Sequence, residues 1–191
     1  MDTTRKTLLI RVRNRSDSLA WRECVGLYRP LLVGYARARG LQAEDAEDIA
    51  QQCLESISQH IANFDYDPGR GGFKKWLHTL VNNRVRNLLR RRRERLAESG
   101  DFERPQGRER SPEEMWEQLW LGEHLKYCLE QIRPQVEPKT YQAFCRVALE
   151  QQPVKAVSRE IGMTAEQIYV AKSRMTKRLR EMMTDLLGES T

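Results

Sequence analysis

The apolar residues of this chain recur at intervals of three and four positions over most of its length, and this spacing constrains its fold more than any other feature. Side chains spaced in this way fall along one side of an α-helix, whereas a half-buried strand needs an apolar residue at every second position. Almost no stretch alternates in that second way, and there is no internal repeat. We therefore expect an all-α protein.

The predicted helices form two groups. In the first group, Pro30 should kink the first helix and Gly40 should end it. The second helix opens with acidic side chains, which the helix dipole favours there, and a Gly-rich loop follows it. The helices of this group are expected at residues 18–39, 43–63 and 73–96, with the loop at residues 64–73. Those of the second group are expected at residues 113–132, 140–150, 154–161 and 165–187.

The segments outside the helices suggest how the domains are arranged. Residues 1–17 are polar and should be flexible, and residues 97–112 have the composition of a flexible linker. We expect two small helical domains, at residues 18–96 and 113–191, on either side of that linker.

Composition excludes several classes of protein. With 39% hydrophobic and 31% charged residues, the chain can fill small cores but hardly one large enzyme core around a buried pocket. No apolar run is long enough to span a bilayer, and the start of the chain has no signal-peptide segment. The four scattered cysteines predict buried thiols in a reducing compartment. We expect a cytoplasmic protein that is not an enzyme and does not enter a membrane.

The distribution of charge points to nucleic acid. The net charge is +6, and positive side chains dominate residues 84–95 and 172–180. Between the first of these stretches and the apolar residues after Pro112 the charges are mixed and net acidic. Two basic faces joined by a neutralising linker suit a protein that holds DNA at two places.

The strongest local pattern is a pair of helices around Gly162. This residue type tolerates the positive φ of a helix-turn-helix turn, and Thr164 can cap the second helix. Val157, Ile161 and Ile168 would lock the two helices together. The second helix would present its N-terminal side chains to the major groove and its later cations to phosphates. The candidates are Thr164, Gln167, Tyr169, Val170, Ser173, Arg174, Lys177 and Arg178. The alternative is an ordinary helical hairpin with a solvated basic face.

The helix expected at residues 73–96 combines three kinds of side chain that suit a single strand with unstacked bases. Aromatic rings beside the Gly-rich loop offer stacking, Asn82 and Asn83 offer amide hydrogen bonds, and the run 90–93 offers four arginines for phosphates. For Trp76 alone we favour core packing. For the arginine run, phosphate contact is the better interpretation than a solvated helix end.

No residue pattern indicates a metal, a cofactor or a catalytic centre. Asp45 and Asp48 lie one helical turn apart but lack a third and fourth ligand. The three histidines have no cysteine or carboxylate at ligand spacing, and the loop sequence GRGG lacks the Lys-Ser/Thr of a P-loop.

Taken in order, these parts resemble the extracytoplasmic-function sigma factors, the initiation specificity subunits of bacterial RNA polymerase. The similarity covers about residues 18–187 and corresponds to their regions two and four, with the third region absent. It implies a protein that binds core polymerase, recognises the −10 and −35 promoter elements and promotes DNA melting. The implied partners are promoter DNA, the β′ clamp helices and β flap of core polymerase, and an anti-sigma factor.

Within region two, the family pattern D-A-E-D-[LI]-x-Q-E is matched at residues 45–52, except that Gln52 stands where glutamate is usual. The resemblance implies that this helix docks on the β′ clamp helices, with slightly weaker docking because one charge is missing. The implied core-binding residues are Asp45, Asp48, Ile49, Gln51 and Gln52.

The next family pattern, [FW]-x-x-W-L-x-x-[IL]-x-x-N-x-x-x-[DN]-x-x-R, is matched from Phe73 to Arg90. The resemblance implies that this helix and the preceding loop read and open the −10 element, with a flipped base held by the loop. The implied residues are Gly69, Arg70, Phe73, Trp76, Asn83, Arg84, Arg86, Asn87, Arg90 and Arg91.

Region four departs from the family pattern T-V-K-S-R-L-x-R-A-R, of which only Ile168 and Arg174 are kept. The sequence preference at the −35 element should therefore differ from that of ordinary members. A helix-turn-helix repressor or activator with an N-terminal sensor or dimerisation domain is the alternative. A nuclease that uses Asp45 and Asp48 is a more distant one.

Overall fold

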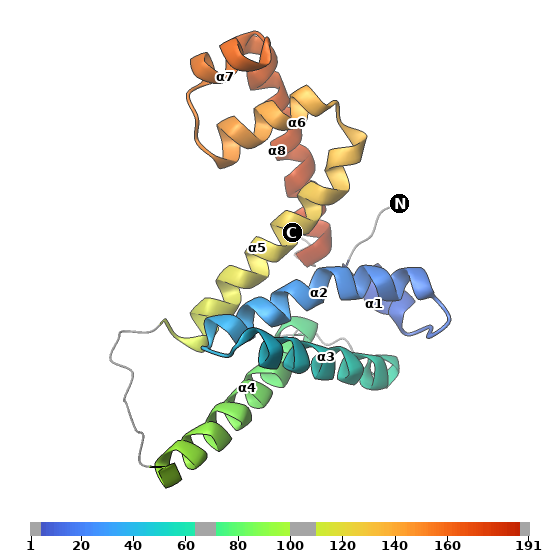
Figure 1. The fold of residues 1–191 in the computed structure, drawn as a ribbon. Coiled ribbons are helices and arrows are strands. Elements are labelled where there is room, and N and C mark those ends of the chain that lie inside the picture. The colour runs from blue at the N-terminus through green and yellow to red at the C-terminus, as the bar shows by residue number, and fades with distance from the viewer. Residues whose placement is uncertain (1–4, 64–71, 100–109, 188–191) are drawn as a thin grey trace. The chain divides into compact units, whose positions relative to one another are not determined.

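The computed structural model describes residues 5–63, 72–99 and 110–187, and every regular element in these ranges is helical (Figure 1). The all-α prediction is confirmed. The chain divides into two compact units, one of residues 7–123 and the other of residues 1–6 with 124–191. No helix in the described ranges is both long enough and apolar enough to cross a membrane.

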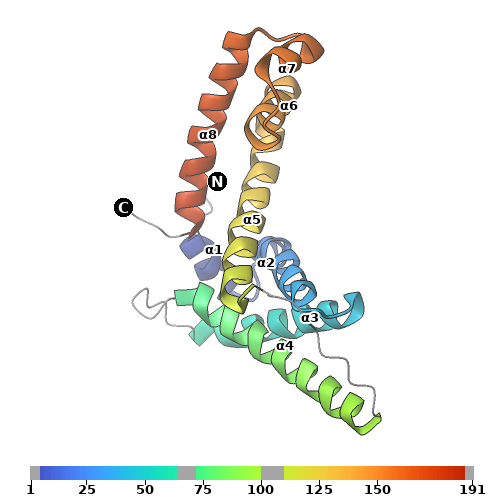
Figure 2. The ribbon, with the colours of Figure 1, turned by 90° about the vertical axis from the view of Figure 1, so that its left-hand side faces the viewer.

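Three long helices, α2 (Ser18–Ala38), α3 (Ala43–His60) and α4 (Gly72–Ser99), form most of the first unit. A short 3-10 turn at Ile61–Asn63 follows α3. Both α3 and α4 pack on α2, and their shared core contains the buried side chains Tyr28, Leu31, Tyr35, Ala46, Ile49, Cys53, Phe73, Leu77, Val81 and Val85. The last turns of α4 extend away from α2 and α3 in both Figure 1 and Figure 2, and Arg93 and Arg95 are exposed to solvent there.

The start of the chain differs from the expectation. The prediction that residues 1–17 are flexible is wrong for α1 (Arg5–Val12). Leu8, Leu9 and Val12 are buried, because a helix brings these positions onto one side. Asp17 then caps α2 by accepting a hydrogen bond from the Ala20 backbone N–H at 2.9 Å, and the Arg11 guanidinium pairs with the same carboxylate.

Helix α5 (Pro112–Ile132) begins in the first unit. The sequence had instead predicted that the second domain starts at residue 113. Ser111 and Glu114 cap this helix reciprocally through 3.1 Å and 3.0 Å hydrogen bonds to each other's backbone N–H groups. Trp116 and Trp120 lie one turn apart on its buried side. The centroid of the Trp116 ring lies 5.4 Å from that of Tyr35, and the centroid of the Trp120 ring lies 6.1 Å from that of Tyr28. Because of this packing, α5 belongs to the first unit as far as Glu123.

The second unit contains the rest of α5, then η3 (Arg133–Gln135), α6 (Pro138–Phe144), a π-helical turn at Cys145–Leu149, α7 (Val154–Ile161) and α8 (Ala165–Leu187). Its helix-turn-helix core is small and apolar, consisting of Ala143, Val147, Val157, Ile161 and Ile168. The predicted lock is confirmed, because its three residues all lie in this core.

The turn between α7 and α8, visible at the top of Figure 2, also has the predicted geometry. Gly162 adopts φ +70°, the left-handed region that glycine reaches without steric cost. The Ser158 hydroxyl donates to the Met163 carbonyl at 2.6 Å. Thr164 accepts from the Gln167 N–H at 3.2 Å, while the Gln167 side chain accepts from the Thr164 N–H at 2.8 Å. This capping box holds the start of α8 in place.

Candidate nucleic-acid and protein-binding surfaces

A basic groove of about 790 Å³ runs along α4 in the first unit. Its lining residues are Arg39, Asn82, Asn83, Arg86, Asn87, Leu89, Arg90, Arg93, Pro112 and Glu113. Four guanidinium groups and three carboxamides face one acidic side chain in that set, so the groove presents mainly hydrogen-bond donors and positive charge. The structure thus brings together four of the residues implied for the −10 element, namely Asn83, Arg86, Asn87 and Arg90.

No sequence pattern pointed to Arg39, at the end of α2, as a residue of this groove. Asn82, which the sequence predicted to offer amide hydrogen bonds to a single strand, lies in the groove as well. The Asn82 Oδ1 atom accepts hydrogen bonds from the Tyr35 hydroxyl at 3.0 Å and from Arg39 Nη1 at 3.4 Å. No sequence pattern joins Arg39 to Asn82, because only the packing of α2 against α4 makes them neighbours.

Other residues implied for DNA have contacts inside the protein. Phe73 is buried, with its ring 5.2 Å from that of Tyr28, so it anchors the start of α4 in the core. Trp76 is half-buried, 5.5 Å from Phe73, which fits the core-packing interpretation. Gly69 and Arg70 lie outside the described residues.

The arginines of α4 have different surroundings. Arg84 turns toward α3, where its guanidinium donates to the Ser56 hydroxyl at 2.6 Å and approaches the Gln52 carbonyl at 3.5 Å. Arg92 forms an ion pair with Asp45 at the start of α3. Arg91, by contrast, is exposed to solvent. Arg84 and Arg92 therefore hold α4 on α3, whereas Arg91 is available to an external anion.

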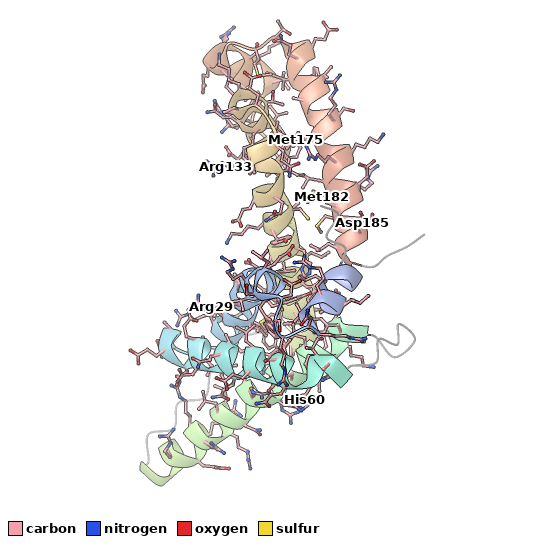
Figure 3. All side chains as sticks on the ribbon, turned by 90° about the vertical axis from the view of Figure 1, so that its right-hand side faces the viewer. Arg29, His60, Arg133, Met175, Met182 and Asp185 are labelled. Carbon is pink, nitrogen blue, oxygen red and sulfur yellow. The ribbon has the colours of Figure 1, made fainter. Side chains whose placement is uncertain are left out.

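The exposed side of α3 carries polar side chains suited to a protein partner. Asp48, Gln51 and Gln52 are exposed, whereas Ile49 is buried in the core. The Glu47 carboxylate pairs with Arg29 of α2 at 2.9 Å, and Figure 3 labels that arginine. Five residues were implied for binding to core polymerase. Asp48, Gln51 and Gln52 lie together on this surface, whereas Ile49 is buried beneath it and Asp45 pairs with Arg92.

On α8 the residues implied for the −35 element fall into two sets. Tyr169 and Val170 are exposed, at 58% and 44% of their surface, and Ser173, Arg174 and Lys177 are exposed beside them. Thr164 and Gln167 instead form the capping box. Arg178 is half-buried and donates to the Gln135 side chain. A nucleic acid on this surface would thus meet an aromatic ring and two free-standing cations.

The four cysteines are all free, and Cys24, Cys53 and Cys128 are buried, as the sequence predicted, whereas Cys145 is only partly buried. Burial raises the pKa of Cys24 to about 12, and those of Cys53 and Cys128 to about 11. These thiols are therefore protonated at neutral pH and act as small apolar side chains. Within the described ranges, no three His, Cys, Asp or Glu side chains gather as metal ligands would.

Comparison with known proteins finds similarity to sigma factors. Residues 24–95 match the family model for sigma-70 region 2. The chain is 28% identical over 120 residues to the ECF RNA polymerase sigma factor SigE of Mycolicibacterium smegmatis, an alignment that covers 61% of this chain and 44% of the relative. It is 30% identical over 87 residues to the ECF RNA polymerase sigma factor RpoE of Cereibacter sphaeroides, covering 46% of this chain and 47% of that one.

Each alignment thus spans less than half of the relative. Among solved structures, CnrH in complex with the cytosolic domain of CnrY aligns over 93% of this chain and 96% of that one, at 15% identity and a TM-score of 0.39. The region-2 match covers α3, α4 and most of α2, the helices that build the basic groove and the polar side of α3. Residues 24–95 therefore match sigma-70 region 2, and the chain is similar to two extracytoplasmic-function sigma factors over part of its length.

Proposed function

We propose that this protein directs transcription initiation, by binding core RNA polymerase and recognising promoter DNA at the −10 and −35 elements. The observation that carries the proposal is the groove along α4, where Arg39, Arg86, Arg90 and Arg93 surround three asparagines in a region-2 domain. Arginines suit phosphates and carboxamides suit base edges, so one surface can hold a strand and read it.

The other surfaces take complementary roles in this proposal. The exposed Asp48, Gln51 and Gln52 of α3 dock on the β′ clamp helices of the polymerase. The exposed side of α8 contacts the −35 element, and the region-4-like unit also meets the β flap. An anti-sigma factor is a further partner that the similarity to extracytoplasmic-function sigma factors suggests. Strand opening needs no cofactor, because the energy of holoenzyme binding to the promoter supplies it.

The test is run-off transcription with purified core polymerase on genomic DNA fragments, followed by mapping of the start sites. We expect discrete transcripts that appear only when the protein is added, with shared sequence elements upstream of their starts. Core polymerase with the Arg86→Ala, Arg90→Ala double variant serves as the control and should give much weaker signals. Specific DNA binding by the protein alone, without any transcript, would instead support a helix-turn-helix repressor or activator.

A further inference from the structure

Asn82 lies at the edge of the basic groove and is held there by a hydrogen-bond network. The Tyr35 hydroxyl donates to Asn82 Oδ1 at 3.0 Å, and Arg39 Nη1 lies 3.4 Å from the same oxygen. His78 Nε2 lies 3.3 Å from the Tyr35 hydroxyl. A phenol has a single proton, which Tyr35 donates to Asn82, so its oxygen accepts from Arg39 Nη1 at 3.4 Å and, in the tautomer protonated at Nε2, from His78.

The ring of Tyr35 is held by packing as well as by its hydroxyl. It is fully buried and meets the rings of Trp116 and His78 edge-on, at centroid distances of 5.4 Å and 5.5 Å. Its hydroxyl therefore has one direction in which to donate. A donor held this rigidly determines which atom of the Asn82 carboxamide faces it, because the amide can accept only through Oδ1.

With two donors on Oδ1, the amino group of Asn82 is the polar group left for an external partner. It makes no hydrogen bond to the described part of the chain, and Asn82 is half-exposed on the groove wall. Val81 and Val85 supply the buried side of α4 here, so core packing does not require an asparagine at this position.

The chemistry around this amino group indicates what it binds. Arg39 stands beside it, and Arg86, Arg90 and Arg93 line the same groove. An N–H donor next to guanidinium groups fits an oxygen acceptor that carries negative charge, and on a nucleic acid that acceptor is a backbone phosphate. Asn82 differs from the other two asparagines of the groove because its Oδ1 atom already accepts two hydrogen bonds, so it cannot make the paired donor and acceptor contacts by which an asparagine reads a base edge.

We infer that Asn82 and Arg39 together bind one phosphate of the promoter strand, and that Tyr35 and His78 are positioning residues that direct the Asn82 amino group to it. The inference rests on the proposed function, because it adds a contact to the same DNA surface. The sequence pointed to Asn82 only as an amide for a single strand, and it did not point to Arg39, Tyr35 or His78 at all.

The test uses holoenzyme, made from the full chain and core polymerase, with a fluorescent promoter fragment mapped by run-off transcription. Tyr35→Phe removes the hydroxyl and keeps the ring, so promoter affinity should fall by roughly tenfold, as expected for loss of a charge-assisted hydrogen bond. Asn82→Ala should produce a similar loss. If Tyr35 acts through Asn82, the double variant should be no weaker than Asn82→Ala alone.

Two further variants separate positioning from stability. Tyr28→Phe removes a hydroxyl from another buried tyrosine of α2, away from the groove, and should leave promoter affinity unchanged. Arg39→Gln should reduce the slope of log affinity against log salt concentration by about 0.7 to 0.9, the value for one lost phosphate contact. Replacing the base pairs of the −10 element one at a time should not change the size of the Asn82→Ala defect.

Several outcomes would overturn the inference. Unchanged affinity of Tyr35→Phe, or losses that add in the double variant, would show that the network serves only the fold. An Asn82→Ala defect that depends on one base pair would replace the phosphate by a base. A wild-type protein that yields no transcript would overturn the proposed function itself, whereas wild-type transcription with an unaffected Tyr35→Phe variant would overturn only the positioning role.

Discussion

Arg84 and Arg91 have the same side chain on the same helix but different surroundings. Arg84 reaches the Ser56 hydroxyl on α3, while Arg91 is exposed. The sequence motif placed both on DNA, because charge and spacing along α4 do not say which side chains reach a neighbouring helix. The sequence could therefore predict a positively charged helix. It could not predict which of its arginines bind another helix and which remain available to DNA.

These two arginines give a matched pair of variants. Arg84→Ala should lower the free energy of unfolding by about 1 kcal/mol, because it removes a partly buried hydrogen bond between α3 and α4. Arg91→Ala should leave stability within about 0.5 kcal/mol of the wild type and weaken binding to DNA of any sequence. Urea unfolding followed by circular dichroism, together with DNA titration, measures both effects. Equal stability of the two variants would contradict the division.

His78 should make stability depend on pH. Burial lowers its pKa below the usual value, Glu113 and Glu117 oppose this, and Arg39 and Lys74 add to it. The unfolded state then binds a proton that the folded state does not. Stability from this group is complete above the unfolded pKa of about 6.5 and is lost as the pH falls below it.

The measurement is urea unfolding at pH 8.0 and pH 5.5 for the wild type and for His78→Phe, which keeps an aromatic ring beside Trp116 but cannot titrate. The variant should lose less stability between the two pH values than the wild type does. His60→Gln, at the exposed end of α3 (Figure 3), provides a second histidine variant for comparison. If His78→Phe loses as much stability between pH 8.0 and pH 5.5 as the wild type does, the pH dependence belongs to another group.

Among the elements, the helix-turn-helix was the most predictable and α5 the least. Gly162, Thr164 and the apolar triplet Val157, Ile161 and Ile168 act within one short stretch, so local rules were sufficient. The sequence predicted that one side of α5 is apolar, but the spacing of apolar residues does not indicate which helices pack against that side. Trp116 and Trp120 pack with aromatic residues of α2 and α4, which lie far away along the chain.

The two tryptophans should contribute to the stability of the first unit. Trp116→Ala and Trp120→Ala should each lower its free energy of unfolding by about 3–5 kcal/mol, the usual cost of emptying a buried aromatic site. Leu121→Ala on the same helix removes a side chain that is 50% exposed and should cost little. A fragment of residues 1–123 should resist urea better than one of residues 1–109. Equal midpoints for the two fragments would contradict this assignment of α5.

The exposed side of α3 can be tested for polymerase binding. Asp48→Arg with Gln51→Ala should weaken binding to core polymerase, by about 1–3 kcal/mol for each contact desolvated in the complex. The helix content measured by circular dichroism should not change. Asp45→Asn is the matched control, because its partner is Arg92 within the chain, and it should affect stability more than polymerase affinity. Unchanged affinity of the double variant would leave this side of α3 as a solvated face.

At the scale of the whole molecule, positive charge is concentrated on two helices, one in each unit. Arg91 of α4 and Arg174 of α8 are both exposed. If each neutralises a promoter phosphate, Arg91→Ala and Arg174→Ala should each reduce the salt dependence of holoenzyme binding by about 0.9 on duplex DNA. The double variant should lose the sum, because distant sites act independently. On a shorter promoter fragment that contains the −10 element but lacks the −35 element, only Arg91→Ala should reduce the salt dependence.

The continuity of α5 across the boundary between the units has a practical consequence for protein engineering. One such use is a chimera in which the C-terminal half of this protein is exchanged for that of a relative. A crossover within residues 100–109 would give the host domain foreign residues in place of Trp116 and Trp120. A crossover after Glu123 would keep residues 7–123, which form one compact unit, from a single parent. Chimeras joined after Glu123 should therefore fold without further mutations at the junction.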